Sequence, residues 1–407
     1  MTGPIPFCGI RTRVRASLPT EFFMRFEFAT ATRIVFGAGA VNDAGAIARD
    51  FGRRALVVTG RDSSRVERVL ASLRSAGASA VTFSVAGEPE LKTVEQGATL
   101  AKAERCELVI GFGGGSALDA AKAIAAMLTN DGELLDYVEI IGRGKALTKW
   151  SAPFIAIPTT AGTGAEVTRN AVLASLEHKV KVSLRSPLML AKVALVDPEL
   201  TCVLPPALTA STGLDALTQL IEPFVCNRAN PMTDGLCVEG LRRAARSLRV
   251  AFSKGQDKDA REDMAVASLF GGLALSNAGL GAVHGFAGPI GGSFPAPHGA
   301  ICAALLPHVM AMNLRALRRR DPHGAALYRY EEAAWWLTGD SKAKADDGVE
   351  WVRALVTDLK VPRLGSFGIQ QTHIADLVVK AAKASSMKTN PIVLAPEELT
   401  EILEQAL

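Results

Sequence analysis

The fold of the first half is decided by LVIGFGGGSALDAAKAIA (Leu108–Ala125). An apolar run with strand character leads directly into three successive glycines and Ser116, and a helical pattern follows at once. Glycines at such a junction let a diphosphate approach the backbone, where free N–H groups and the helix dipole hold its oxygens. A tight glycine turn without a ligand is the alternative. The three glycines followed by a serine favour phosphate binding.

Short apolar runs alternate with helical stretches from about Arg33 to Val196. Uninterrupted apolar strands between amphipathic helices are typical of a parallel sheet covered on both faces. The pattern predicts an α/β, Rossmann-like domain. Besides LVIGFG, its strand candidates are RIVFG (Arg33–Gly37), ALVVTG (Ala55–Gly60), AVTFSV (Ala80–Val85) and FIAIPTT (Phe154–Thr160).

From about Pro205 the alternation stops and long helical patterns follow, which predicts an all-α second domain. We expect a flexible N-terminal extension over 1–24, a dinucleotide-binding α/β domain over 25–203 and an all-helical domain over 204–407. The helix candidates of the second half are Leu214–Phe224, Thr233–Phe252, Arg261–Asn277, Ala300–Leu317 and Asp347–Leu359.

Bulk composition excludes several classes of protein. The 407 residues are 48% hydrophobic and 21% charged, which is typical of a well-packed globular chain. The net charge of +4 is too small and too dispersed for a nucleic-acid partner. We find no uncharged apolar run of about 18 residues, and therefore expect no membrane span. Six scattered cysteines without a CxxC pair indicate reduced thiols in the cytoplasm.

A second loop of small residues, PTTAGTGAE (Pro158–Glu166), follows another strand candidate. Two such loops at strand carboxyl ends indicate a ligand crevice in an open α/β sheet. The strand ALVVT ends at Gly60 and Arg61, where dinucleotide folds usually place an acid that binds the adenosine ribose. The arginine favours NADP, although Asp62 just beyond could restore a preference for NAD.

Four side chains in the second half suggest a metal site. Asp215 and Gln219 are one helical turn apart on the same face of an apolar helix. His284 and His298 bracket a Gly/Pro-rich stretch within Ala278–Ala300. A lone histidine is more often a satisfied core residue, but two in one stretch, with a lone acid nearby, favour a divalent metal. Asp, His and His supply three ligands and leave one position open.

The chain resembles the iron-containing (group III) alcohol dehydrogenase family, which is related in fold to glycerol dehydrogenase and dehydroquinate synthase. The resemblance spans roughly Phe26 to Leu407 and rests on GGGSALDAAK, PTTAGTGAE, KVALVDPEL, TGLDALTQ and GLGAVHGFAGPIGGSFPAPHGA. It implies that metal and cofactor lie in the cleft between the two domains. By matching motif it implies a diphosphate site (Gly113, Gly114, Gly115, Ser116), a cofactor groove (Asp119, Thr159, Thr160, Thr163), a lysine near the nicotinamide ribose (Lys181) and metal ligands (Asp215, Gln219, His284, His298).

The chain departs from the family's commonest pattern at two positions. Gln219 stands where a fourth, histidine ligand is usual, and Gly288 stands where a histidine near the nicotinamide is usual. A glutamine is a weak neutral donor, so we expect an effectively Asp-His-His site in which zinc competes with iron. The proton of the reaction then leaves through water, a cofactor hydroxyl or another side chain, with His308 as one candidate.

The resemblance implies a metal-dependent alcohol dehydrogenase, or aldehyde or ketone reductase, that uses NAD or NADP and forms a homodimer or larger oligomer. The metal is expected to act as a Lewis acid, Fe²⁺ or Zn²⁺, and the nicotinamide to carry the hydride. We expect loops carrying Phe286, Phe294 and Pro295 to form a mainly apolar pocket. The alternatives are a maleylacetate reductase-like activity on an anionic substrate, a lyase of the dehydroquinate synthase type, and a metal-free nucleotide-binding homologue without turnover.

Overall fold

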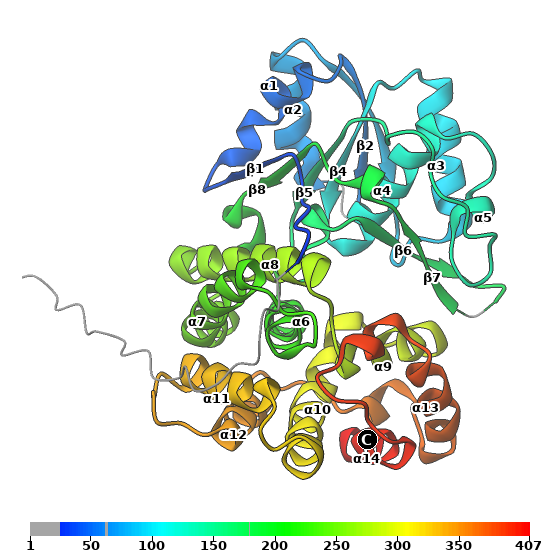
Figure 1. Ribbon diagram of the computed structural model, residues 1–407. Coiled ribbons are helices and arrows are strands. Elements are labelled where there is room, and N and C mark those ends of the chain that lie inside the picture. The colour runs from blue at the N-terminus through cyan, green and yellow to red at the C-terminus, as the bar shows by residue number, and fades with distance from the viewer. Residues whose placement is uncertain (1–24, 62–63, 179) are drawn as a thin grey trace, which may run out of the picture.

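The computed structural model describes residues 25–61, 64–178 and 180–407, and the expected extension over 1–24 lies outside them. Its first half contains a six-stranded parallel sheet with the order β1-β8-β5-β4-β2-β3 (Figure 1). The prediction of a parallel α/β sheet is confirmed, and every strand candidate is a strand. The bounds are β1 (Arg33–Phe36), β2 (Arg54–Thr59), β3 (Ser79–Ser84), β4 (Leu108–Gly113), β5 (Phe154–Pro158) and β8 (Val193–Val196).

Both faces of this sheet are buried, which explains the uninterrupted apolar strands. Along β2, Leu56 and Val58 belong to one hydrophobic cluster, whereas Ala55 and Val57 belong to another on the opposite face. Strands β4 and β5 are buried at every position. The helices of this half are α1 (Ala44–Arg49), α2 (Glu67–Ser75), α3 (Leu91–Ala103), α4 (Gly115–Thr129) and the short α5 (Leu134–Tyr137).

An antiparallel hairpin of β6 (Asn170–Ser175) and β7 (Val180–Arg185) extends from this half towards α9 (Figure 1). The sequence interpretation missed it. Buried residues alternate with half-buried ones along β6, and so this segment lacks the continuous apolar run of the sheet strands. The hairpin matters for the site because β7 carries Lys181.

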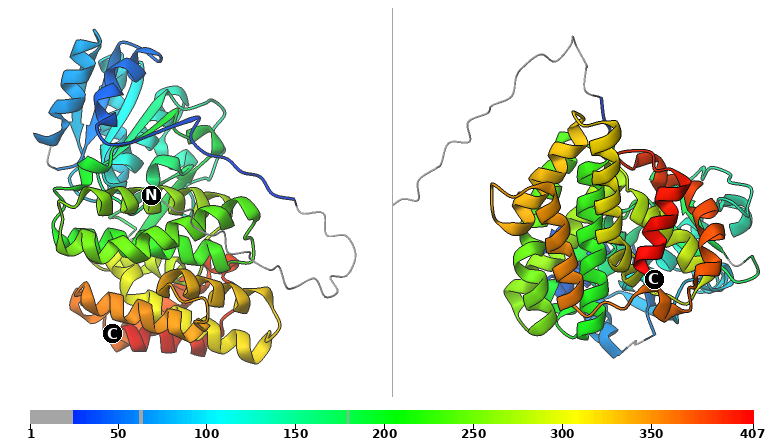
Figure 2. Two further views of the ribbon diagram at one scale, coloured as in Figure 1. Left: turned by 90° about the vertical axis from the view of Figure 1, so that its left-hand side faces the viewer. Right: turned by 90° about the horizontal axis from the view of Figure 1, so that it is seen from below.

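The second half is all-helical, as predicted. Helices α6, α7 and α8 lie directly beneath the sheet-containing half, and α11, α12 and α14 lie farther from it (Figures 1 and 2). One hydrophobic cluster joins the helices from α6 to α14. They are α6 (Pro206–Val225), α7 (Pro231–Ser253), α8 (Lys258–Asn277), α9 (Ala282–Ser293), α10 (His298–Arg320), α11 (Ala325–Thr338), α12 (Ala345–Asp358), α13 (Ile374–Ala382) and α14 (Pro396–Ala406).

Part of the Gly/Pro-rich stretch is the helix α9, so the expectation of a pocket-shaping loop was wrong for Phe286, whereas Phe294 and Pro295 lie in the loop between α9 and α10 and their pocket role stays a prediction. Phe286 is fully buried in the helical core and forms no pocket wall. The glycines permit close packing, since a Cβ on Gly285 would lie 2.8 Å from Cε of Met387. Tertiary packing has here overridden the poor helix propensity of glycine.

Within the described part of the chain, α10 has the length and hydropathy of a membrane span. Of its most apolar window, 83% is buried inside the protein, and α8 and α9, which pass the same test only as a pair, meet at 97°. Burial in the core therefore accounts for the apolar sequence of α10.

The two halves meet where the loop after β5 packs onto α6 and α8. Gly164 has φ +59°, and a Cβ on it would lie 2.4 Å from Cα of Gly272 in α8. A Cβ on Gly162 would lie 2.7 Å from Cβ of Thr212 in α6. Because these glycines have no side chain, the backbone of the loop after β5 packs directly against α6 and α8, which fixes the loop against the helical half.

Candidate metal and cofactor site

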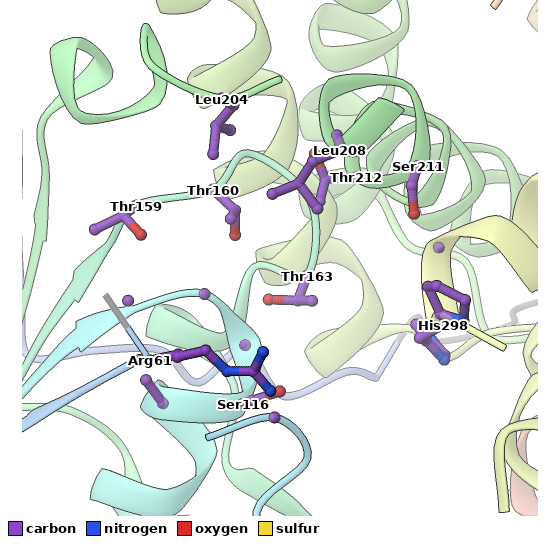
Figure 3. A pocket seen from close by; sticks show the side chains of 18 of the residues that line it. Arg61, Ser116, Thr159, Thr160, Thr163, Leu204, Leu208, Ser211, Thr212 and His298 are labelled. Carbon is purple, nitrogen blue, oxygen red and sulfur yellow. Dashed lines mark hydrogen bonds between the residues drawn. The ribbon is translucent and has the colours of Figure 1, made fainter. Parts of the chain in front are cut away.

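A cavity of about 390 Å³ lies between the two halves. Figure 3 shows Arg61, Ser116 and the threonines after β5 on one side of it, with Ser211, Thr212 and His298 on the other. One cavity therefore joins the loops of the sheet to two of the predicted metal ligands. Its lining includes Gly60, Arg61, Gly113, Gly114, Gly115, Ser116, Thr159, Thr160, Thr163, Asp215 and His298.

The glycine loop opens this cavity at the start of α4. Strands β2 and β4 are neighbours, but the chain continues from β2 to β3 on one side and from β4 to β5 on the other. The loops that follow β2 and β4 therefore leave the sheet at a topological switch point, where open α/β sheets bind ligands. Helix α4 begins after Gly114 with no side-chain cap, which leaves its first N–H groups suited to an anion. A Cβ on Gly115 would lie 2.9 Å from Cγ2 of Thr163, so a larger residue would push the two loops apart.

Two residues with predicted cofactor roles do not line the cavity. The carboxylate of Asp119 accepts the N–H of Val172 at 3.0 Å and pairs with the buried Nζ of Lys122 at 3.4 Å. Burial raises the pKa of Asp119, against the effect of Lys122. Lys181 pairs with Glu88 at 3.1 Å. Their contacts with a cofactor stay predictions.

The metal end gathers side chains from three helices. Nε2 of His284 in α9 and Nε2 of His298 in α10 lie 3.5 and 3.7 Å from Oδ1 of Asp215 in α6. Cys302, one turn after His298, joins them, and the four ligand atoms lie within 4.8 Å of one another. Oδ1 of Asp215 is buried without a hydrogen-bond partner among the described residues. A buried carboxylate with one oxygen free of hydrogen bonds, beside two imidazoles and a thiol, fits a divalent metal.

The cluster is strongly coupled electrostatically. Although burial opposes it, the imidazoles of His298 and His284 and the amide of Gln219 lower the pKa of Asp215. Burial is likewise outweighed at His284, where Cys302, Asp215 and Glu222 raise the pKa well above its usual value. Burial would raise the pKa of Cys302, but the two imidazoles lower it. A metal held by these residues would displace the protons of the imidazoles and the thiol.

Glu222 orients His284 and was missed by the sequence interpretation. Its Oε2 lies 2.7 Å from Nδ1 of His284, and its Oε1 accepts the N–H of Val283 at 2.7 Å. A proton held on Nδ1 leaves Nε2 free to face Asp215. The available signal was spacing, because Asp215, Gln219 and Glu222 follow the i, i+4, i+7 pattern of one helix face.

Gln219, Gly288 and His308 are the other positions that the sequence linked to the metal or to the proton of the reaction. The Oε1 atom of Gln219 is buried without a hydrogen-bond partner among the described residues. A Cβ on Gly288 would meet no atom within 4 Å, so open space surrounds the position. Nδ1 of His308 lies 3.3 Å from Oε1 of Gln405 in α14, which gives this histidine a structural contact away from the cluster.

Comparison with known proteins identifies the same two-part architecture. Residues 31–198 match the family model "Iron-containing alcohol dehydrogenase", and residues 209–407 match "Fe-containing alcohol dehydrogenase family, C-terminal". Long-chain-alcohol dehydrogenase 1 of Geobacillus thermodenitrificans is 39% identical over 84% of this chain and 85% of its own. NAD-dependent methanol dehydrogenase of Bacillus methanolicus is 33% identical over 92% and 97%.

A crystal structure of 1,3-propanediol oxidoreductase superposes with a TM-score of 0.87 at 33% identity, covering 94% of this chain and all of the other. Together with the fold and the cluster of carboxylate, imidazole and thiol, these matches leave one assignment. The chain belongs to the iron-containing alcohol dehydrogenase family and is an oxidoreductase that acts on CH–OH groups.

Proposed function

We propose that this protein reversibly oxidises small alcohols to aldehydes or ketones, with NAD(H) or NADP(H) and one Fe²⁺ or Zn²⁺ ion. The observation that carries the proposal is the single cavity in which the glycine loop and the ligands Asp215 and His298 meet. A cofactor on the loop can therefore extend its nicotinamide towards the metal ligands. The bound metal supplies Lewis acidity, and the nicotinamide accepts or donates the hydride.

The chain's own residues bind, orient and exclude water. Gly113, Gly114, Gly115 and Ser116 are proposed to hold the diphosphate at the start of α4, and Thr159, Thr160 and Thr163 to line the groove above it. Glu222 holds the proton on Nδ1 of His284. Helices α9 and α10 close the far side of the ligand cluster, so Asp215, His284 and Cys302 are shielded from water while His298 stays partly exposed to the cavity.

The charges that line the cavity bear on the choice of cofactor and of substrate. The likeness to an NAD-dependent methanol dehydrogenase supports NAD, whereas Arg61 at the cavity edge offers a partner for a 2′-phosphate. The arginines that line the described cavity, Arg61 and Arg65, come from the region after β2, while the lining near His298 is uncharged apart from Asp215. This distribution favours neutral alcohols over the anionic substrate of a maleylacetate reductase-like enzyme. We also propose a cytoplasmic homo-oligomer, in line with the sequence expectation.

The test is the formation of reduced nicotinamide from a series of alcohols, measured by absorbance on chelator-treated and metal-reloaded protein. Activity should require metal and should be lost in Asp215→Asn, which removes a charged ligand. Asp376→Asn, in an exposed ion pair on α13, is the matched control and should behave like the parent. Turnover that survives complete removal of metal, or in Asp215→Asn, contradicts the proposed mechanism.

A further inference from the structure

Cys302 is a fully buried thiol with no part in the mechanism above. Its Sγ lies 3.9 Å from Nε2 of His284 and 3.7 Å from Nε2 of His298. Helix α10 begins at His298, so the cysteine follows one turn later on the same helix face. A regular helix therefore holds both side chains towards the carboxylate of Asp215.

Four of the six distances among these atoms are close to the edges of a tetrahedral metal site. With zinc–nitrogen and zinc–oxygen bonds of about 2.1 Å and a zinc–sulfur bond of about 2.3 Å, tetrahedral geometry requires N···O and N···S separations of about 3.4 and 3.6 Å. The N···O separations are 3.5 and 3.7 Å, and the N···S separations are 3.7 and 3.9 Å. These four distances exceed the tetrahedral values by a few tenths of an ångström, and all four ligand atoms lie within 4.8 Å of one another, so a single ion can contact them after small shifts.

The donor chemistry also favours the cysteine over the neighbouring glutamine. The amide oxygen of Gln219 is neutral, whereas a thiolate is an anionic ligand that suits zinc and related soft or borderline ions. Asp215 and the thiolate together would neutralise a buried dication, and the thiol proton would leave for solvent on metal binding. Among the described residues, Cys302 is the cysteine that forms part of such a cluster.

We infer that Cys302 binds the metal as a thiolate and serves as its fourth protein ligand in the role for which Gln219 is a poor donor. The inference rests on the proposed metal centre. The site is then Asp-His-His-Cys and prefers zinc to harder ions such as Mn²⁺, and a substrate oxygen would bind from the cavity side as a fifth ligand.

Cobalt(II) substitution tests the inference without measuring activity. Chelator-treated parent protein is titrated with Co²⁺, whose visible d–d bands report binding and whose near-ultraviolet sulfur-to-cobalt charge-transfer band reports a thiolate ligand. The variants are Cys302→Ser and Cys302→Ala. The controls are Cys226→Ser, which alters another buried thiol, and Cys8→Ser, which tests a thiol outside the described residues.

The expected result is a charge-transfer band in the parent and both controls, and its complete loss in either folded Cys302 variant that retains the d–d bands. If both Cys302 variants fail to fold, the band in the parent and both controls still supports the inference. Saturated d–d bands in the parent without charge transfer would overturn the role of Cys302 and leave the metal centre intact. Absence of all cobalt bands at saturating Co²⁺ would overturn the metal centre itself, and the inference with it.

Discussion

Replacing Glu222 by glutamine should weaken metal binding about 10- to 100-fold, although Glu222 is not among the candidate metal ligands. Both carboxylate oxygens accept hydrogen bonds at 2.7 Å, one from the N–H of Val283 and the other at Nδ1 of His284. An amide has only one acceptor oxygen, so it can accept a hydrogen bond from only one of these partners. Either orientation carries a cost.

If the amide oxygen faces Val283, the NH₂ group faces Nδ1 of His284 and forces its proton onto Nε2, the nitrogen directed at Asp215. If the amide flips, the correct tautomer survives but two donors face each other in a buried place, at a cost of about 1–3 kcal/mol. Loss of such an orienting partner typically weakens metal affinity about 10- to 100-fold, equivalent to about 1.4–2.7 kcal/mol.

The assay is zinc competition against a chromophoric chelator at fixed pH, accompanied by thermal unfolding of the metal-free protein. Glu401→Gln, in α14 and paired with Arg315 near the opposite end of α10 from His298, is the matched control and should leave zinc affinity unchanged. A Glu222→Gln variant that stays folded and binds zinc as tightly as the parent would refute the orienting role.

Three further predictions concern stability and the cofactor. Burial raises the pKa of Glu166 to about 7, above its ordinary 4.5, so the folded state binds more protons than the unfolded state between these values. The parent should therefore lose about 3 kcal/mol of unfolding free energy as pH rises through this window, and Glu166→Gln should not, as denaturant titrations near pH 5 and pH 8 can show. Gly272→Ala places a Cβ 2.6 Å from the carbonyl oxygen of Gly164, and should cost about 1–3 kcal/mol and weaken cofactor binding. Gly235→Ala in α7, where a Cβ meets no atom within 4 Å, is its control in calorimetry and NAD titration, and equal behaviour of the two variants would refute the packing argument. Arg61→Ala should raise the KM for NADP far more than the KM for NAD in steady-state kinetics. An equal change in both KM values would refute the proposed contact between Arg61 and the 2′-phosphate of NADP.

Much of the fold was predictable because local pattern and tertiary environment agree. The strands of the sheet are buried on both faces, so their sequences are continuously apolar, and the long amphipathic patterns of the second half became helices. Prediction failed where packing decides the conformation. Glycines at and before the start of α9 let the backbone approach its neighbours: a Cβ on Gly281, which immediately precedes the helix, would lie 2.8 Å from Oε1 of Glu222. No local propensity reports such a contact.

Sequence spacing along a helix predicted part of the candidate site, but only where the bounds of the helix could be recognised. The i, i+4 relation of Asp215 and Gln219 suggested a common direction, and the structure places both in the buried interior beside His284. The same relation joins His298 to Cys302, but it emerges only once α10 is known to begin at His298. Before that, Cys302 is one of six scattered cysteines in an apolar sequence.

Gln219 and Cys302 have to be interpreted together because the fold brings their helices to one carboxylate. Gly299 allows this approach, since a Cβ there would lie 2.3 Å from the carbonyl oxygen of Ser211, and α10 could not otherwise come so close to α6. A metal requires a certain number and type of donors and not a donor at one fixed sequence position. A weak donor on α6 can therefore be compensated by a strong donor on α10. On this reasoning, the glutamine that suggests a failing metal site in the sequence is, in the structure, one half of an exchange of ligands.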